Sequence, residues 1–393
     1  MPFYFCPENI DENILIENHK KAQNILNCNN SRNAAAPIDN IIAKRQIIDW
    51  KLVEHTTKQI IRDFFKIIAV LFSPRRQNSA YVAFIPRGDM GDLIRETSIL
   101  VELVKMSPSV IVDIYGHTSK LKPIFIGIKN IRYFFHEHSF KILRNCYDLI
   151  YSFSDVDCAK IDFIKAGKEL TDKIIANKQE YTAKFLTPIN CINKLKISAA
   201  VDNVYDDKLL MSYKTKSLKK FGIKPETKYI TFQQAATDKG TMFHAKCWSN
   251  DNWLRFIEIL NNNMDKDIKI VRVGIGGGGI SGYNIIDTMK KTSFNELCSI
   301  IKNSLLHIDI DGGCVHIAKA LGTKALVLWG VTPGDYIGYD NNINIASSMC
   351  RYCWDYHWTF HCVFGEAHQK CIQSIAPEFA AQKAIEYLRT ILK

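Results

Sequence analysis

The chain has 393 residues, of which 47% are apolar and 23% charged, and its formal net charge is +11. These values are ordinary for a globular protein and exclude wholesale disorder, collagen-like repeats and a coiled coil. A chain of this length commonly forms two or three domains and buries about 75% of its unfolded surface, so it needs no disulfide or metal to hold a core. The positive charge favours anionic partners such as nucleic acids, membrane surfaces and phosphorylated small molecules.

The amino terminus reads Met-Pro-Phe-Tyr-Phe-Cys-Pro-Glu and lacks the basic segment that opens a secretory signal. The longest apolar run, at 67–72, is much shorter than the roughly 18 residues that a membrane span requires. We therefore expect a cytoplasmic protein. Its twelve cysteines are then expected to be reduced thiols or metal ligands rather than disulfides.

Residues 1–76 form a polar, Asn-rich extension with one clear helix prediction, at 57–72, where apolar residues recur with a period of 3.6. This helix either packs on the next domain or lies in a membrane interface. A strand at 81–85, a glycine-rich turn, a helix at 93–104 and a strand at 110–115 then predict a βαβ unit. Further short strands are predicted at 131–135 and 149–153.

A lysine-dense segment at 155–224 separates this domain from a second alternation of strands and helices. We expect strands at 229–232, 268–273, 306–310 and 325–329, and helices at 252–260, from 294, at 314–321 and at 377–392. The sequence therefore predicts an α/β protein with an N-terminal extension (1–76), an N-terminal Rossmann-like domain (77–215) and a C-terminal Rossmann-like domain (216–393).

The first candidate site follows the strand at 81–85. Gly91 and Asp92 lie in a glycine-rich turn that opens a helix, so the backbone can approach a ligand closely and the helix start attracts negative charge. The turn lacks the third glycine of a dinucleotide motif and the Gly-Lys-Ser/Thr of a P-loop. Asp92 is either a helix-capping acid or a carboxylate that acts as general base.

Two more candidate segments lie in the second domain. Lys246, in a loop between a strand and a helix, is either a solvated surface lysine or a phosphate ligand. Asp311 ends a strand, and Gly312 and Gly313 follow at a helix start whose amides and dipole suit a diphosphate. His316, one turn into that helix, is either a buried histidine with satisfied hydrogen bonds or a donor to phosphate or ribose.

Five motifs in chain order resemble those of glycosyltransferase family 9, the heptosyltransferases. They are Gly91-Asp92, Lys246-Cys-Trp248, Lys291 to Leu297, Asp311-Gly-Gly313 with His316 and Ala318, and Gly330-Val-Thr332-Pro333. Gly312 stands where the family usually has Thr, which frees the backbone and removes a hydroxyl. The first 76 residues match nothing in the short lipopolysaccharide-core enzymes of the family.

The resemblance implies a GT-B fold, with two Rossmann-like doubly wound domains facing a cleft, and an inverting transfer of heptose from an ADP-activated donor. It implies that 77–215 is the acceptor domain and that 216–393 is the nucleotide-sugar domain. It implies that Asp92 is the general base for the acceptor hydroxyl and that Gly91 contributes to substrate binding. Lys246 would hold the donor diphosphate. Asp311, Gly312, Gly313 and His316 would bind the nucleotide-sugar, and no catalytic cofactor is required.

Four thiols lie within 22 residues at 350–371, and the first two have the spacing of a metal-ligand pair. These are Cys350, Cys353, Cys362 and Cys371. They are either reduced thiols under a loop or ligands of a structural Fe or Zn ion. The cluster resembles an iron-binding finger of the family 9 subfamily that modifies autotransporter proteins.

The acceptor implied by the resemblance is either a glycolipid of the lipopolysaccharide core or a protein hydroxyl. The lysine-dense 155–224 segment suits an anionic glycolipid and peripheral contact with the inner membrane, whereas the cysteine finger and the extension suit a protein acceptor and a homo-oligomer. The alternative function is a catalytically inactive GT-B protein that binds a nucleotide or glycan. No nucleic-acid partner is expected, because no recognition motif or basic-aromatic stripe is present.

Overall fold

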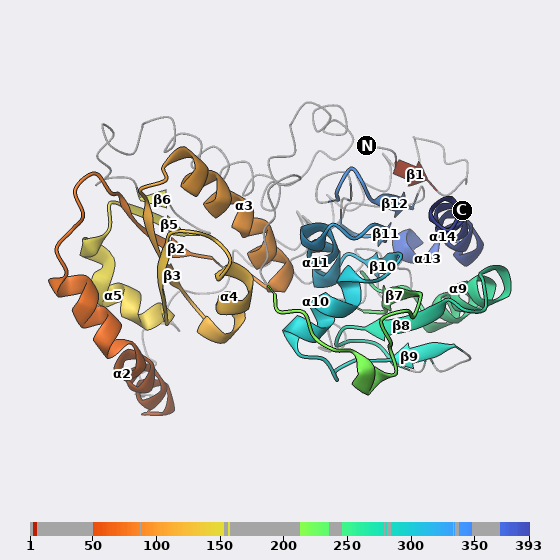
Figure 1. The fold of residues 1–393 in the computed structure, drawn as a ribbon, viewed down its shortest axis with the longest axis horizontal. Coiled ribbons are helices and arrows are strands. Elements are labelled where there is room, and N and C mark those ends of the chain that lie inside the picture. The colour runs from red at the N-terminus through yellow and green to blue at the C-terminus, as the bar shows by residue number, and fades with distance from the viewer. Residues whose placement is uncertain are drawn as a thin grey trace, which may run out of the picture. The chain divides into compact units, whose positions relative to one another are not determined.

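The computed structural model describes residues 3–5, 50–86, 88–152, 156–157, 213–235, 246–278, 280, 284–332, 334, 338–347 and 370–393. They belong to two compact units (Figure 1). Among the described residues, the amino-terminal unit contains 50–157 and the carboxyl-terminal unit contains 3–5 and 213–393. Each unit is an α/β fold built on a largely parallel sheet, which confirms the predicted fold class.

The amino-terminal unit holds a five-stranded sheet with the order β4-β3-β2-β5-β6. Its strands are β2 (Tyr81–Ile85), β3 (Ile111–Tyr115), β4 (Ile131–Phe135), β5 (Leu149–Ser152) and β6 (Val156–Asp157). Only β6 is antiparallel to its neighbour. Every residue of β2 is buried, as its uninterrupted apolar sequence predicts for a parallel strand covered on both faces.

Helices α3 (Met90–Met106) and α4 (Thr118–Phe125) follow β2 and β3 in the chain. Helix α2 (Trp50–Phe72) lies along one edge of the unit beside the short helix α5 (Phe140–Leu143), as Figure 1 shows. It starts earlier than the prediction at 57–72. None of the helices in the described parts of the chain combines the length and the apolar character that crossing a bilayer would take.

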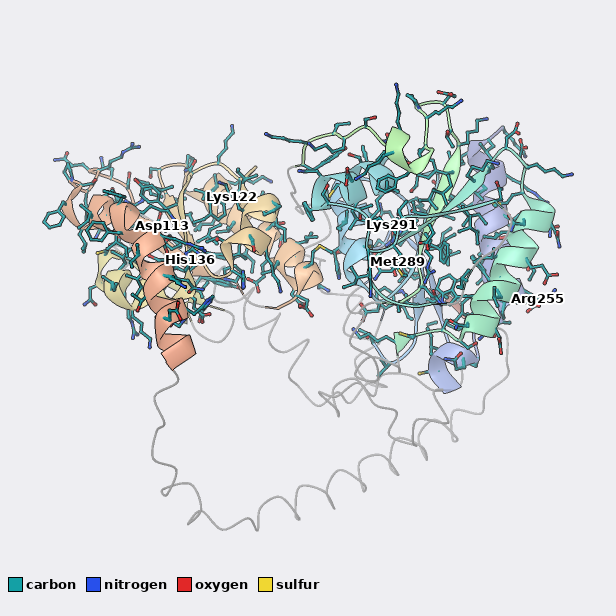
Figure 2. All side chains as sticks on the ribbon, turned by 90° about the horizontal axis from the view of Figure 1, so that it is seen from below. Asp113, Lys122, His136, Arg255, Met289 and Lys291 are labelled. Atoms are coloured by element: carbon teal, nitrogen blue, oxygen red, sulfur yellow. The ribbon has the colours of Figure 1, made fainter. Side chains whose placement is uncertain are left out.

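The inner face of α2 is held by a fully buried acid, Asp63. Its carboxylate accepts hydrogen bonds from Lys66 Nζ at 2.6 Å, Ser139 Oγ at 2.7 Å and the backbone N–H of His136 at 2.7 Å. Figure 2 labels His136 on the segment after β4. Because a buried carboxylate is costly without partners, these bonds join the helix firmly to that segment.

The carboxyl-terminal unit holds a seven-stranded sheet with the order β1-β12-β11-β10-β7-β8-β9, in which all pairs are parallel. The strands are β1 (Phe3–Phe5), β7 (Tyr229–Gln233), β8 (Lys269–Val273), β9 (Ile285–Asp287), β10 (His307–Ile310), β11 (Ala325–Trp329) and β12 (Ile343–Ala346). The predicted extension therefore contributes to both units, since β1 joins this sheet and α2 the other unit.

The helices of this unit are α9 (Asn250–Asn263), α10 (Phe294–Lys302), α11 (Gly313–Leu321), α13 (Lys370–Gln373) and α14 (Pro377–Ile391). Ser293 caps α10 through the predicted capping box with Glu296. Buried Trp248, Trp253 and Phe256 pack edge to face and join α9 to the sheet core.

Strand order places the candidate segments at the carboxyl edges of both sheets. In the amino-terminal unit the chain runs β2-β3-β4 in one direction and returns to β5 on the other side of β2. In the carboxyl-terminal unit it runs β7-β8-β9 and returns to β10 on the other side of β7. Ligands of open parallel sheets bind at such switch points, and Asp92 follows β2 just as Asp311 follows β10.

Candidate active site

The carboxyl-terminal switch point gathers polar groups around Asp311, a buried residue just beyond β10. Lys246 Nζ forms an ion pair with Asp311 Oδ2, and Thr332 Oγ1 donates a 2.6 Å hydrogen bond to the same oxygen. Burial alone would raise the pKa of this carboxyl group, but the charge and hydrogen bond of Lys246, with Thr332, hold it below its ordinary value. Asp311 is therefore charged at neutral pH and pairs with the ammonium of Lys246.

Helix α11 begins beside this ion pair. Its N-cap is Gly312, which supplies no side-chain acceptor to the first-turn amides. A Cβ at this position would lie 3.2 Å from Gln233 Nε2 and 3.3 Å from Asp309 Oδ1, so the tight packing of the turn explains the glycine. The helix start and the lysine thus bring positive charge to one edge of the sheet, which suits an anionic ligand.

His316 lies buried one turn into α11. Its Nδ1 is 2.6 Å from the hydroxyl of Tyr339, and the two rings meet edge to face with their centroids 5.7 Å apart. This contact matches the alternative of a buried histidine with a hydrogen-bond partner. Its charge also contributes to the lowered pKa of Asp311, so it belongs to the same electrostatic cluster.

Two glutamines at the end of β7 complete this edge, and no sequence motif pointed to either. Gln233 donates to the carbonyl of Ala235 at 2.9 Å and packs against both Gly274 and Gly312. Gln234 accepts a 2.6 Å hydrogen bond from buried Arg272, and a Cβ at Gly277 would collide with it. Gly274 and Gly277, in the loop after β8, therefore make room for these amides.

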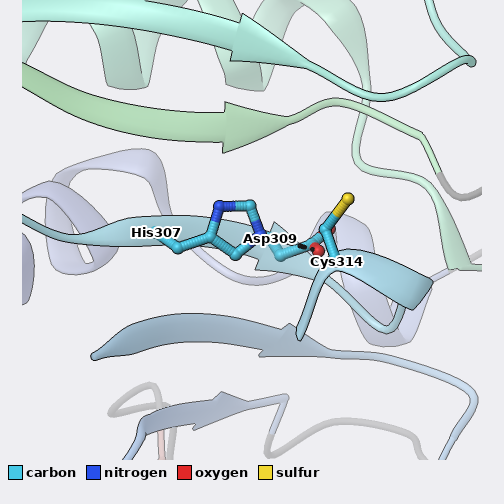
Figure 3. Close-up of side chains that lie close together, drawn as sticks. All are labelled: His307, Asp309 and Cys314. Atoms are coloured by element: carbon cyan, nitrogen blue, oxygen red, sulfur yellow. Dashed lines mark hydrogen bonds and ion pairs between the residues drawn. The ribbon is translucent and has the colours of Figure 1, made fainter. Parts of the chain in front are cut away.

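A second buried cluster lies beneath the turn, where Figure 3 shows His307, Asp309 and Cys314. His307 Nε2 is 3.1 Å from Asp309 Oδ2, and its Nδ1 is 2.9 Å from Thr231 Oγ1. Burial raises the pKa of Asp309 to about 6 and that of the Cys314 thiol well above its usual range. Although the three ligand atoms lie within 4.8 Å of one another, a protonated thiol favours a hydrogen-bonded core cluster that supports the turn.

In the amino-terminal unit, half-buried Gly91 and Asp92 lie in the first turn of α3. Asp92 Oδ2 accepts a 3.1 Å hydrogen bond from the backbone N–H of Asp89, as expected of a capping acid. Gly88 has φ of +111°, and a Cβ there would lie 2.5 Å from Asp92 Oδ2. The turn thus fixes the carboxylate at the helix start, and the role of general base remains a proposal.

Of the four predicted metal ligands, Cys371 is buried in α13. Cys350, Cys353 and Cys362 lie outside the described residues. Helix α13 is joined to the segment after Lys246, because Gln373 accepts from the backbone N–H of Ser249 at 3.0 Å and donates to the carbonyl of Cys247 at 2.9 Å. The last cysteine of the predicted finger therefore lies on a helix that holds the backbone directly after Lys246.

Residues 202–357 match the family model described as glycosyltransferase family 9 (heptosyltransferase). This confirms the resemblance found in the motifs: the match to family 9 lies in the carboxyl-terminal part of the chain and supports a glycosyltransferase. No curated protein sequence matches the chain.

Solved structures with a similar fold include glycosyltransferases. The iron-containing dodecameric glycosyltransferase TibC from enterotoxigenic E. coli is 14% identical, with 80% of this chain and 77% of that chain covered and a TM-score of 0.54. TibC in complex with ADP-D-β-D-heptose is 13% identical, with 81% and 78% covered and a TM-score of 0.52. The E. coli ADP-heptose heptosyltransferase II is 15% identical, with 80% and 100% covered and a TM-score of 0.49. The likeness to TibC confirms the GT-B fold.

Proposed function

We propose that this protein transfers heptose from ADP-heptose to a hydroxyl group with inversion at the anomeric carbon. The observation that carries the proposal is the cluster of Lys246, Asp311 and Thr332 beside the glycine-capped start of α11, at the switch point of the carboxyl-terminal sheet. The complex of TibC with ADP-D-β-D-heptose supports this donor class.

Donor binding follows from the charges at this edge. A diphosphate placed at the start of α11 meets the amides of Gly312 and Gly313, the positive end of the helix and the ammonium of Lys246. The same groups favour departure of ADP, because they neutralise the negative charge that develops on the leaving oxygen. His316, held by Tyr339, adds a further polar group on α11.

The transfer is a single displacement. Asp92 accepts the proton of the acceptor hydroxyl, whose oxygen bonds to the anomeric carbon while the bond from that carbon to the diphosphate oxygen breaks. ADP leaves, and the configuration at the anomeric carbon inverts. The reaction requires no redox cofactor, since no atom changes oxidation state.

The acceptor is a hydroxyl of a glycolipid core or of a protein. Cys350, Cys353, Cys362 and Cys371 are proposed as ligands of a structural Fe or Zn ion, which would stabilise the finger and take no part in the chemistry. TibC is an iron-containing dodecamer, which supports a metal site and a homo-oligomer in this chain as well.

The decisive experiment follows transfer by the purified full chain from ADP-heptose to acceptors of both classes, with the product configuration read by NMR. We expect Asp92→Asn to retain donor binding and lose transfer, and Lys246→Ala to weaken donor binding. Lys266→Ala, an exposed lysine of the same unit, is the matched control. Donor binding without turnover in the wild type would favour the inactive binding protein, and unimpaired transfer by Asp92→Asn would remove the assigned base.

A further inference from the structure

Helix α2 has a second apolar face, opposite the one that Asp63 joins to the unit. Its residues recur at helical spacing over the last three turns of the helix. They are Ile61, Phe64, Phe65, Ile68, Leu71 and Phe72, and we call them the outer stripe. Phe65 is 83% exposed, Phe72 77% and Ile61 65%, so the packing of the unit leaves this face uncovered. Such a cluster of large apolar side chains marks a binding surface.

The surroundings of the outer stripe are basic. Within residues 50–76 there are six cations, Lys51, Lys58, Arg62, Lys66, Arg75 and Arg76, and two acids, Glu54 and Asp63. Glu54 pairs with Lys58, and Asp63 is buried on the inner face. The outer stripe itself, from Ile61 onward, contains no charged residue. An apolar face bordered by lysine and arginine is the pattern of a helix that lies in the plane of a membrane interface.

A pocket of about 660 Å³ adjoins the carboxyl end of α2. Ala69 and Ser73 of the helix line it, together with Arg76 and residues at the amino-terminal edge of the sheet, among them Ser79 and Arg132. Arg132 forms a hydrogen-bonded ion pair with buried Asp113, while Arg76 is exposed. This edge is opposite the one that carries Asp92, so the pocket is distinct from the candidate active site. Its size and its arginine suit an anionic headgroup.

The dimensions of the outer stripe argue against a second copy of the chain as its occupant. From Ile61 to Phe72 the helix is about 18 Å long at ~1.5 Å per residue. A stable dimer interface buries about 800 Å² per partner and takes roughly 20 to 30 residues from each side. Six side chains along one helix are too few, and the cations beside them would repel their own copies.

We propose that the outer stripe of α2 docks on an anionic phospholipid bilayer, with its phenylalanines in the interface and a lipid headgroup in the pocket lined by Arg76. This deepens the peripheral membrane contact expected from the sequence, and it does not depend on the proposed catalytic residues. The helix would lie in the plane of the bilayer surface, with the outer stripe toward the lipid.

The test is co-sedimentation of the full chain with vesicles of phosphatidylcholine alone or mixed with phosphatidylglycerol. We expect the wild type to bind the mixed vesicles, more weakly at high salt because exposed charges are screened. Phe65→Ser with Phe72→Ser should weaken binding by at least about tenfold, since both rings lose burial in lipid. Arg76→Glu should reduce binding to the anionic vesicles specifically.

Ile126→Ser with Ile142→Ser is the matched control, because both side chains are exposed in the same unit and lie outside α2. Equal binding of this control and the phenylalanine variant, or no binding of the wild type to mixed vesicles, would overturn the proposal. An oligomer that dissociates in the phenylalanine variant without vesicle binding would instead assign the stripe to a second copy. Transfer measured on a soluble acceptor without lipid tests the proposed function separately.

Discussion

The ammonium of Lys246 and the carboxylate of Asp311 form an ion pair between residues that are 65 positions apart in the chain. Both side chains are largely buried, and the carboxylate also accepts the hydroxyl of Thr332. In this arrangement Asp311 is a positioning residue for the lysine and need not touch the donor. The pair therefore explains why a carboxylate lies beside the proposed binding site for the donor diphosphate.

Asp311→Asn should lower donor affinity by at least about tenfold, because the variant keeps the shape of the side chain but no longer holds the ammonium by charge. Thr332→Val, which removes one hydrogen bond to the same oxygen, should have a smaller effect in the same direction. Titration of ADP by calorimetry measures both. Equal affinity in the wild type and Asp311→Asn would show that the ion pair does not position Lys246 for the donor.

The stability conferred by Asp311 should depend on pH. Its pKa in the folded chain is lower than the ordinary value of 3.8, so the unfolded chain binds the proton first as the pH falls. The contribution of this carboxylate is complete well above pH 4 and is lost as the pH falls through the lowered value. The difference in denaturant midpoint between wild type and Asp311→Asn should therefore shrink from pH 7 to pH 3. A difference that stays constant over this range would contradict the assignment.

Gly312→Ala should destabilise the carboxyl-terminal unit and weaken ADP binding. The new methyl group would lie 3.2 Å from Gln233 Nε2 and 3.3 Å from Asp309 Oδ1, and overpacking of this kind costs about 1–3 kcal/mol. Gly278→Ala is the matched control, since a Cβ there meets nothing within 4 Å. Thermal unfolding with and without ADP measures both effects. If the two variants behave alike, the glycine is not required by packing.

Asp63→Ala should loosen α2. Removal of this buried carboxylate takes away the acceptor of buried Ser139 and of the His136 backbone N–H, at a cost of about 1–3 kcal/mol, while Lys66 keeps the carbonyl of Phe134. Amide hydrogen exchange of α2 should become faster, whereas Glu54→Ala, which removes an exposed ion pair on the same helix, should leave it nearly unchanged. Equal exchange in both variants would mean that packing of Ile67 and Val70 alone holds the helix.

The sequence predicted most of the central strands because their apolar runs are covered on both faces and bounded by turn residues. Strands β2, β4 and β11 have the predicted bounds. The strands β1, β9 and β12 were missed, because they are only 3, 3 and 4 residues long and so give too short a local pattern. Helical periodicity likewise found α2 but could not tell which of its faces the unit covers.

The candidate site was predicted in the same uneven way. Asp311, Gly312 and Lys246 were found because glycines at a helix start and a lysine in a strand-to-helix loop carry a local signal. The contacts of Gln233, Thr332 and Tyr339 were not predicted, since each meets a partner from another part of the fold. For Thr332 a signal existed in the family-like Gly-Val-Thr motif, but nothing in it pointed to the carboxylate of Asp311.

Loss of the proposed metal should weaken donor binding although no residue of the donor site is substituted. Helix α13 carries Cys371, and its residue Gln373 holds the backbone of Cys247 and Ser249 directly after Lys246. If the finger loosens when its ion is removed, the hydrogen bonds of Gln373 loosen too, and the ammonium of Lys246 loses its position.

Elemental analysis of protein purified without added metal should find about one equivalent of Fe or Zn, if the four thiols hold an ion. Both Cys353→Ser and a chelator should lower metal content and ADP affinity together.

Gln373→Ala separates the two parts of this prediction. It removes the hydrogen bonds to Cys247 and Ser249 but none of the proposed ligands, so it should lower ADP affinity while the metal content stays at that of the wild type. Gln382→Ala should change neither quantity. Gln382 is an exposed glutamine of α14, and its side chain donates a hydrogen bond to Glu386 of the same helix. If metal-free protein binds ADP with full affinity, the finger does not affect the position of Lys246. If every preparation lacks metal, the proposed four-thiol metal site is wrong.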